Sequence, residues 1–429
     1  MRPVCSLSTC AALGLAAAAA CRTPSQAQFF TIDPLAPHTR SPAIAVSADG
    51  RVVVGFSENV GQAIAYAWTR EEGRTDWLGP GVLGSYSYAI SEDGRFDVGQ
   101  VGTTSGGGAS LREIATGQFL ILSHLTGYTR ANGLGVSRDG GVTVGRVWRG
   151  GGMGNGAANA SMAVRWDASG AVTAMGYLHA GDTFSEAAAV TPDGGTVVGS
   201  SRYSLDVTYP WRWTAAAGMV GLQLPQAGFP SAVAKGVSAD GRYVVGHANV
   251  SVPVQDTIAV RWNEAGLCEP LPLLPGYRSG IAFAVTPDGR TVAGEMQATP
   301  GPPDSITAFV WREGDGTESL AAYLRGRGVE IPQTMHLIRC SGVSADGTMF
   351  VGKCFDTVDL TIIKGFVAVL PPACRADFNK DGGIDGADVE AFFDAWENAR
   401  PGSDVNGDGG IDGADVERFI AEWAAGGCG

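Results

Sequence analysis

Two short acidic loops near the C-terminal end of the chain carry the residues best suited to chemistry. The first loop runs from Asp377 to Asp388, and the same pattern returns from Asp404 to Asp415. Each loop has Asp or Asn at its first, third, fifth, ninth and twelfth positions and glycine at its sixth. Oxygen ligands at these spacings suit calcium, which takes six to eight of them, and the glycine allows the sharp turn. The sequence therefore predicts two calcium sites.

The expected ligand set is the same in both loops. Position seven contributes its backbone carbonyl, and position nine is an acid that often acts through a bound water. The ligands are Asp377, Asn379, Asp381, the Gly383 carbonyl, Asp385 and Asp388, and then Asp404, Asn406, Asp408, the Gly410 carbonyl, Asp412 and Asp415. Four carboxylates converge in each loop, so we expect the segment to fold only with its two Ca²⁺ ions bound. A solvated acidic turn is the alternative, and two in-phase copies argue against it.

Each loop leads into an amphipathic helix that has to hold it in place. Apolar residues recur at i, i+3, i+4 and i+7, the spacing of one helix face. These stripes are Val389, Phe392, Phe393 and Trp396 after the first loop, and Val416, Phe419, Ile420 and Trp423 after the second. The simplest interpretation is that the two stripes form the core of a small all-α module.

The paired loops, each with Asp at position twelve and each followed by a helix, resemble a dockerin. The flanking Cys374 and Cys428 resemble a dockerin variant that is bounded by cysteines. The resemblance spans residues 374–429 and implies docking to a cohesin-type partner on a surface or scaffold. Many dockerin-bearing proteins act in polysaccharide degradation. The recognition positions of the family fall on Gly386, Ala387, Gly413 and Ala414.

A repeated unit fills residues 41–370. Its core is a small residue, Val or Ile, Ser or Thr, one variable residue and then Asp-Gly, followed by a Val-rich run that ends in Gly. Copies about 40–60 residues apart are typical of propellers and solenoids. The recurring aspartates are Asp49, Asp93, Asp139, Asp193, Asp240, Asp288 and Asp346. They could form a catalytic or metal-binding ring, but recurrence at one strand–turn boundary favours a turn residue in each copy.

Each unit can be divided into four short strands. In the first unit Val46–Ser47 opens a hairpin that turns at Asp49-Gly50, because both residues tolerate the positive φ of a tight turn. A Val-rich second strand follows, then a third strand with an aromatic residue, Ala65–Trp68, and a fourth, Asp76–Gly79. Four short strands per unit are typical of a propeller blade. The tryptophans then form core between blades, with a sugar-stacking platform as the alternative.

The ends of the array predict closure into a ring. The seventh unit stops after its third strand, Gly365–Leu370, whereas a spare strand, Phe29–Ile32, precedes the first unit. Pairing these two strands leaves no open edge. We therefore expect a mainly β, seven-bladed β-propeller over residues 28–372, followed by the calcium-binding dockerin-like module over residues 373–429. An open or differently counted array is the alternative.

The units also resemble the extracellular HAF repeat, whose third and fourth strands read roughly His-Ala-Phe-x-Trp and x-Leu-Gly. Ala308–Trp311, and Trp68 with Leu78-Gly79, carry this resemblance. It covers the repeat region and implies a propeller fold and an exported location. It implies no reaction.

The N-terminus predicts export. Arg2 precedes an Ala/Leu-rich run, Ala11–Ala20, and Ala27 ends a small-x-small cleavage site, so residues 1–27 read as a signal peptide. We expect a secreted or cell-surface protein, with a lipoprotein modified at Cys21 as the alternative. No other apolar run is long enough for a transmembrane helix.

Export permits disulfides. Cys340 and Cys354 flank one candidate hairpin, and we expect them to pair. Cys268 is left over and is interpreted as a buried thiol.

Composition narrows the partners. Charged residues make up 17% of the chain, the net charge is −13, and 63 Gly with 22 Pro suit short strands joined by tight turns. The acidic balance argues against nucleic acid and anionic membrane as partners.

We expect a non-enzymatic binding or surface-display protein, whose propeller recognises a glycan or a protein and whose calcium module attaches it to its scaffold. The alternative is a carbohydrate-active hydrolase or lyase of a polysaccharide-degrading assembly, and a purely structural surface-layer component is a third possibility. An enzyme needs paired acids, or His or Tyr with Arg, in some units only. No such set stands out, so no catalytic residue is predicted. The scattered candidates are His124, His179, His247, His336, Glu186 and Glu330.

Overall fold

The structure is a computed structural model. It describes residues 27–104, 106–149, 160–204, 207–225, 229–249, 256–298, 305–371, 375–379, 384–398, 400–405 and 410–424. The chain divides into two compact units. The span Ala27–Leu370 is called the β unit below, and the second unit includes Pro371–Gly429. Nearly all of the predicted signal peptide, and Cys374 and Cys428, lie outside the described residues. Within the described ranges, no helix is both long enough and apolar enough to cross a membrane.

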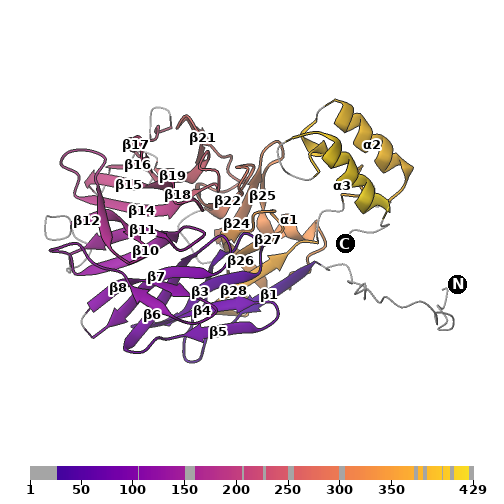
Figure 1. The fold of residues 1–429 in the computed structure, drawn as a ribbon. Helices are drawn as coiled ribbons and strands as arrows, with labels where there is room; N and C mark the ends of the chain where they lie inside the picture. The colour runs from indigo at the N-terminus through magenta and orange to yellow at the C-terminus, as the bar shows by residue number, and fades with distance from the viewer. Residues whose placement is uncertain are drawn as a thin grey trace, which may run out of the picture. The chain divides into compact units, whose positions relative to one another are not determined.

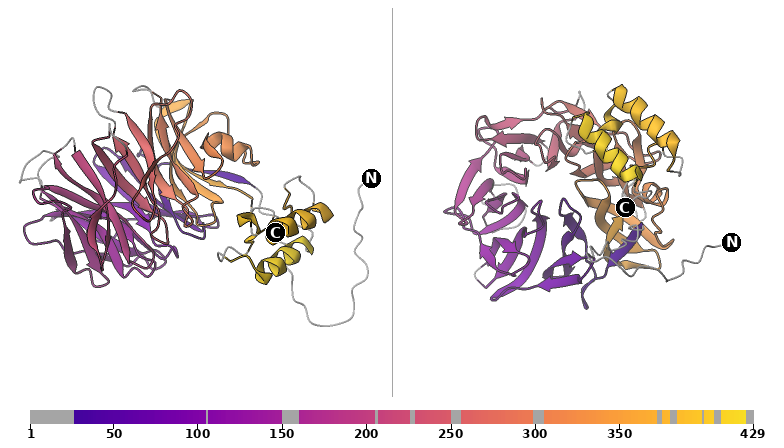
Figure 2. Two further views of the ribbon diagram at one scale, coloured as in Figure 1. Left: turned by 90° about the horizontal axis from the view of Figure 1, so that it is seen from above. Right: turned by 45° about the vertical axis from the view of Figure 1, so that its right-hand side comes forward.

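The β unit confirms the predicted mainly β class, and its sheets are arranged around a common centre (Figures 1 and 2). Four antiparallel strands form most sheets. The first two sheets are β2 (Ala43–Val46), β3 (Val52–Asn59), β4 (Gln62–Thr69) and β5 (Gly73–Trp77), and then β6 (Val82–Ile90), β7 (Phe96–Thr103), β8 (Gly106–Glu113) and β9 (Phe119–Ile121). Two more are β18 (Ser231–Val237), β19 (Val244–Asn249), β20 (Thr257–Trp262) and β21 (Cys268–Pro270), and β22 (Ser279–Val285), β23 (Thr291–Gln297), β24 (Ile306–Arg312) and β25 (Gly316–Ser319).

A larger sheet covers the third and fourth repeats. One parallel pair, Ser161 with Phe184, joins the strands of the two repeats. The strands of the third repeat are β10 (Arg130–Val136), β11 (Val142–Trp148), β12 (Ser161–Asp167) and β13 (Val172–Gly176). Those of the fourth are β14 (Phe184–Val190), β15 (Thr196–Ser204), β16 (Val207–Thr214) and β17 (Gly218–Gly221).

The N-terminal strand completes the last sheet, as the sequence predicted. Strand β1 (Gln28–Ile32) pairs antiparallel with β28 (Asp359–Val369). Strands β27 (Met349–Asp356) and β26 (Met335–Val343) extend this sheet, and the short helix α1 (Leu320–Arg325) precedes it. Because β1 covers the free edge of β28, the first and last parts of the β unit are joined by backbone hydrogen bonds.

The recurring aspartates are turn residues, which confirms the sequence interpretation. In the first copy the Ser47 hydroxyl donates to Asp49 Oδ1 at 2.7 Å, and the Arg51 N–H donates to the same oxygen at 3.0 Å. Gly50 has a φ of +71°, the left-handed region that favours glycine. The same Ser/Thr–Asp bond occurs in all the copies, at Asp93, Asp139, Asp193, Asp240, Asp288 and Asp346.

One apolar residue from the first strand of each repeat points to a shared centre. These residues line a hollow of about 190 Å³, together with shorter side chains such as Ala48 and Pro192. They are Val46, Ile90, Val136, Val190, Val237, Val285 and Val343. The first strands are therefore the inner strands of the β unit. The aromatic residues of the third strands are buried further out, as Trp166 and Trp262 show at 0% exposure, which confirms their interpretation as core.

The predicted disulfide between Cys340 and Cys354 is wrong, because both thiols are free. Cys340 lies opposite Gly352, whereas Cys354 lies opposite Leu337. The two cysteines are therefore offset along neighbouring strands, where Cα atoms are about 7–8 Å apart, beyond the usual reach of a disulfide. Both side chains pack into one apolar cluster, and burial raises the pKa of each thiol to about 12. Cys268 is a free, half-buried thiol.

The C-terminal unit contains α2 (Gly386–Glu397), η3 (Pro401–Ser403) and α3 (Gly413–Ala424). Phe392 and Phe419 are fully buried and stack with ring centroids 4.1 Å apart. The remaining stripe residues pack around them, except Ile420, which is exposed. The predicted stripes thus form the core of this unit, centred on one Phe from each helix.

Candidate functional site

The twelfth residue of each acidic loop closes that loop on itself. Asp388 is fully buried, and its carboxylate accepts the N–H of Asn379 at 3.0 Å and that of Asp385 at 2.9 Å. Backbone hydrogen bonds, that of Asp385 first, hold the pKa of Asp388 below its usual value. Asp415 is equally buried and accepts the N–H of Val405 at 2.7 Å and that of Asp412 at 2.9 Å.

The ninth residue of each loop begins the helix that follows. Asp385 caps α2 by accepting the Ala387 N–H at 2.8 Å, and Asp412 accepts the Ala414 N–H at 2.8 Å. Such an N-cap satisfies a backbone donor that the helix leaves unpaired, and the helix dipole favours the carboxylate there. Positions nine and twelve are therefore fixed by the backbone of the loop and by the first turn of the helix.

Each loop is also held by the helix that follows the other loop. Trp396, in α2, donates its indole N–H to the Asp412 carbonyl at 3.0 Å. Trp423, in α3, donates to the Asp385 carbonyl at 2.9 Å. The apolar stripes in the sequence predicted tryptophans in the core. They did not predict these reciprocal hydrogen bonds, which depend on how the two helices cross.

The structure describes most of the expected calcium ligands. Asp381, Gly383, Asn406 and Asp408 lie outside the described residues, and they include the central acid of each loop. Among the residues that are described, no group of three or more His, Cys, Asp and Glu is placed to hold a metal. The donors of both loops are all oxygens, the chemistry that calcium takes.

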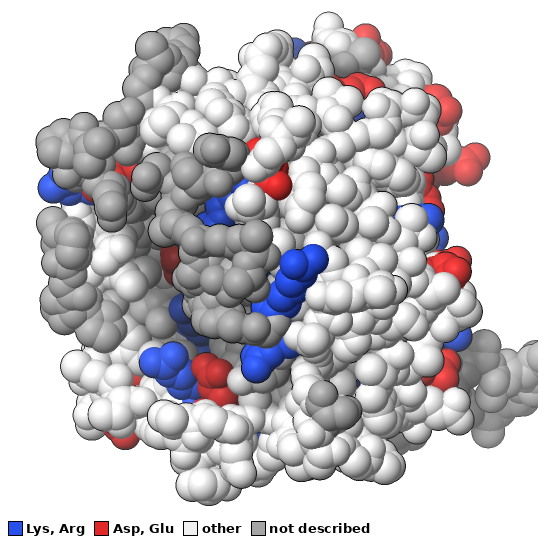
Figure 3. Space-filling model, turned by 90° about the vertical axis from the view of Figure 1, so that its left-hand side faces the viewer, with Lys and Arg blue, Asp and Glu red and all other residues white. Residues whose placement is uncertain are grey.

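A second cluster, which the sequence did not single out, lies on the inner strands of the β unit. We call it the inner belt. Its charged members are Glu58, Arg146, Glu186, Arg202, Lys235, Glu295, Arg339 and Lys353, all on the first or second strand of their repeat and all half-buried. Figure 3 shows basic side chains gathered around the middle of one face of the molecule. The one available signal was recurrence, since several members occupy equivalent places after the repeated aspartates.

Ion pairs in the inner belt link neighbouring repeats. Arg339 and Glu295 form a bidentate pair at 2.7 and 2.8 Å. Arg146 pairs with Glu186 at 3.1 Å, so this acid has the partner that the sequence did not reveal. Burial, with Arg146 nearby, lowers the pKa of Arg202, and burial beside Arg339 lowers that of Lys353. Burial and Lys235 lower the pKa of His247 to about 4, so its imidazole is neutral at pH 7.

The other scattered candidates form no catalytic set among the described residues. His336 contacts the Ile306 carbonyl at 2.6 Å, and His179 lies 3.7 Å from Asp182. His124 contacts a backbone carbonyl, and Glu330 is exposed.

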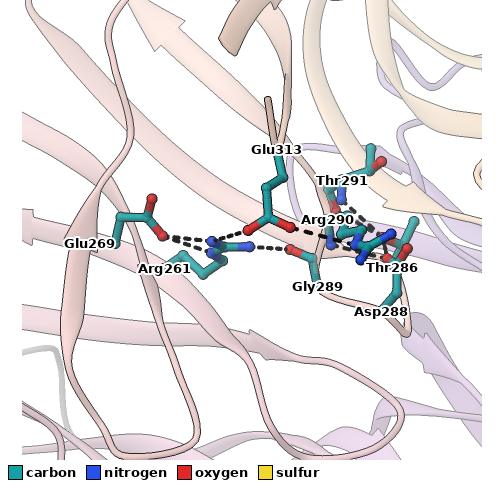
Figure 4. Close-up of polar contacts among 8 residues, drawn as sticks. All are labelled: Arg261, Glu269, Thr286, Asp288, Gly289, Arg290, Thr291 and Glu313. Carbon is teal, nitrogen blue, oxygen red and sulfur yellow. Dashed lines mark hydrogen bonds and ion pairs between the residues drawn. The ribbon is translucent and has the colours of Figure 1, made fainter. Parts of the chain in front are cut away.

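A third polar cluster joins two repeats further from the centre (Figure 4). Arg261, in β20, donates to Glu269 at 2.7 and 3.0 Å and to the Gly289 carbonyl at 2.8 Å. It also donates to Glu313 at 3.0 Å. Gly289 and Glu313 belong to the next repeat, so Arg261 binds two repeats together. Burial disfavours its charge, but the hydrogen bonds to Glu269 and Glu313 outweigh burial and raise the pKa of Arg261.

Known proteins were compared with this chain by sequence and by structure. No family model and no curated protein matches the sequence. The structure is similar to an oligogalacturonate lyase from Vibrio parahaemolyticus, with 11% identity and a TM-score of 0.53 over 81% of this chain and 97% of that one. An oligogalacturonate lyase in complex with manganese has 13% identity and a TM-score of 0.52 over 81% and 98%. The β-propeller domain of the Trilobed protease from Pyrococcus furiosus has 9% identity and a TM-score of 0.48 over 78% and 94%. At these identities, the similarity to the two lyases shows a related mainly β fold and no more.

Proposed function

We propose that this chain is an exported display protein, in which a seven-bladed propeller recognises a ligand and a calcium-dependent module attaches the chain to a surface or scaffold. The observation that carries the proposal is the symmetry of the C-terminal unit. Each loop is closed by its own Asp at position twelve and held by the tryptophan of the other half. An all-oxygen ligand set repeated in this way suits two Ca²⁺ ions.

Calcium would bind Asp377, Asn379, Asp381, Asp385, Asp388 and the Gly383 carbonyl in one loop, and the equivalent residues in the other. Its role is to balance the converging carboxylates, whose repulsion a module this small cannot resist alone. Attachment to a cohesin-type partner belongs to the dockerin resemblance. Immobilised full-length chain should capture a cohesin domain with Ca²⁺ and release it with chelator. No capture in either condition would remove this partner while leaving the calcium sites untouched.

The count of seven blades rests on the inner strands. One Val or Ile from each of the seven repeats reaches the same hollow, and β1 completes the last sheet. The pairing of β1 with β28 covers the outer edge of β28 and joins the two ends of the array by backbone hydrogen bonds. Image averages of the particle viewed down its axis by electron microscopy should show seven lobes. A different count would overturn this part of the proposal.

A polysaccharide lyase or glycoside hydrolase is the second candidate. The similarity to two oligogalacturonate lyases favours it, and the inner belt supplies Arg and Lys side chains in one region, with Tyr88 near Arg146. Incubation with pectic and neutral polysaccharides, read by absorbance of unsaturated products and by reducing ends, separates the two. Products formed at a rate that an inner-belt variant abolishes would make the chain an enzyme.

A further inference from the structure

We propose that the inner belt binds an acidic saccharide, whose carboxylates pair with basic side chains and whose sugar rings lie against neighbouring aromatic rings. This inference rests on the recognition role proposed for the β unit and names its class of ligand. It concerns described residues of β3, β6, β10, β11, β14, β15, β18, β19, β23, β26 and β27.

The charge of the inner belt opposes that of the whole chain. The chain carries a net charge of −13, yet the belt holds five basic residues against three acidic ones. Arg146 and Arg339 use Glu186 and Glu295 in their ion pairs. The ion pairs among the described residues leave Arg202, Lys235 and Lys353 without a carboxylate partner. An acidic ligand is repelled by most of this chain, so attraction has to come from a local cluster of this kind.

Two guanidinium groups converge on one aromatic ring in this cluster. Arg202 lies 4.1 Å from the centre of the Phe184 ring, and Arg146 lies 5.5 Å from it. Arg146 also pairs with Glu186, whereas Arg202 forms no ion pair among the described residues, so the N–H groups of Arg202 remain suited to a carboxylate. Glu186 offsets part of the repulsion between these two cations, and a ligand carboxylate beside Arg202 would offset more of it.

Polar atoms nearby match sugar hydroxyls. Asn132 is opposite Arg146 on the neighbouring strand, and its side-chain oxygen is buried without a hydrogen-bond partner. Arg146 Nε and His247 Nδ1 are likewise buried without a partner. Buried polar groups are nearly always paired in folded proteins, so unpaired groups at one level of the inner strands point to a ligand or water. A hydroxyl both donates and accepts, so it can serve Asn132 and Arg146 together.

Aromatic side chains next to the charges favour a saccharide over an acidic peptide. Tyr86 and Tyr88 are half-buried and stack 5.7 Å apart at 19°. Phe56 of the neighbouring repeat meets Tyr86 edge-on at 4.9 Å. The three rings present flat apolar faces and the two tyrosines add a hydroxyl, which suits a sugar that has an apolar face and a rim of hydroxyls.

The test measures affinity for a matched pair of ligands. Full-length chain is titrated by calorimetry with oligogalacturonate and with its methyl ester, which differ in the charge of the carboxyl groups. We expect the acid to bind at least tenfold more tightly and its affinity to fall with added salt. Arg202→Gln and Lys353→Met should each weaken acid binding about tenfold, because each removes one cation from the belt. Neither change leaves an unpaired carboxylate among the described residues, so both variants should fold like the parent. Arg325→Gln, an exposed cation on α1, is the control and should bind like the parent.

Three results would overturn the inference. The first is equal affinity for the acid and the ester. The second is a loss of acid affinity in Arg325→Gln as large as in Arg202→Gln and Lys353→Met. The third is binding of poly-glutamate that is tighter than binding of oligogalacturonate and depends on Arg202 and Lys353. Melting temperature and calcium stoichiometry are measured on every variant. Parent-like values in both show that lost saccharide binding comes from the belt, and not from unfolding or from failure of the calcium-dependent display role.

Discussion

Replacing Arg261 with Met tests how neighbouring repeats are held together. The Arg261 side chain is 8% exposed, whereas its partners Glu269 and Glu313 are 51% and 45% exposed. Methionine keeps the apolar stem but removes every hydrogen bond, so the Gly289 carbonyl loses its donor. The guanidinium group also leaves the Trp311 ring, 4.6 Å away.

The expected loss is about 2–3 kcal/mol in the free energy of unfolding. A hydrogen bond to a charged group contributes about 1.5–3 kcal/mol when buried, but water reaches both acids here, and exposed pairs contribute at most about 1 kcal/mol. The cation–π contact adds about 1 kcal/mol. Urea unfolding followed by tryptophan fluorescence measures the change.

Arg278→Met is the matched control, because Arg278 is 48% exposed and pairs once, with Asp256 at 3.0 Å. The free energy of unfolding of this variant should fall by less than about 0.5 kcal/mol. Arg261→Lys keeps the positive charge but loses the several N–H donors of the guanidinium group. Its loss of unfolding free energy should lie between those of the two Met variants. Equal losses of unfolding free energy in Arg261→Met and Arg278→Met would show that Arg261 does not hold the repeats together.

Three further outcomes follow. Deleting residues 28–32 should lower the urea midpoint of the β unit and cause aggregation, since β28 loses its partner strand, and parent-like unfolding would speak against ring closure. Trp396→Phe should weaken calcium binding at the second loop, whose Asp412 carbonyl it contacts, and unchanged affinity at that loop in calorimetry would contradict this. Hydrogen bonding by Ser137 lowers the pKa of Asp139, so its stabilisation is complete above about pH 4 and is lost as pH falls through the lower folded value. Asp139→Asn should therefore weaken the acid dependence of the urea midpoint.

The sequence predicted features that depend on local pattern. The Asp-Gly turns, the spare strand Phe29–Ile32 and the apolar stripe of α2 are each encoded within a few residues, and the structure confirms them. Spacing of this kind reports turns and faces directly. The predicted disulfide between Cys340 and Cys354 was wrong although both cysteines lie on one hairpin. Strand register decides whether two such residues lie opposite each other, and bulges in β26 shift that register.

Features that depend on contact between distant segments were not predicted. The inner belt forms because strands of successive repeats meet, so Arg146 finds Glu186 in the next repeat. The hydrogen bonds that Trp396 and Trp423 each donate to the opposite loop likewise depend on the crossing of two helices. Such pairs leave no local spacing to detect. Only the recurrence of positions within the repeat pointed toward the inner strands.

Calcium titration of the full-length chain tests whether the two acidic loops bind calcium. Chain stripped by chelator is titrated with CaCl₂ in a calorimeter, with the helical circular dichroism of the same samples recorded before and after. We expect two ions per chain and a gain in helical signal from residues 386–397 and 413–424. We also expect loss of both responses in the double variant Asp381→Ala, Asp408→Ala. Absence of binding heat with an unchanged spectrum in the parent chain would show that the loops are not calcium sites.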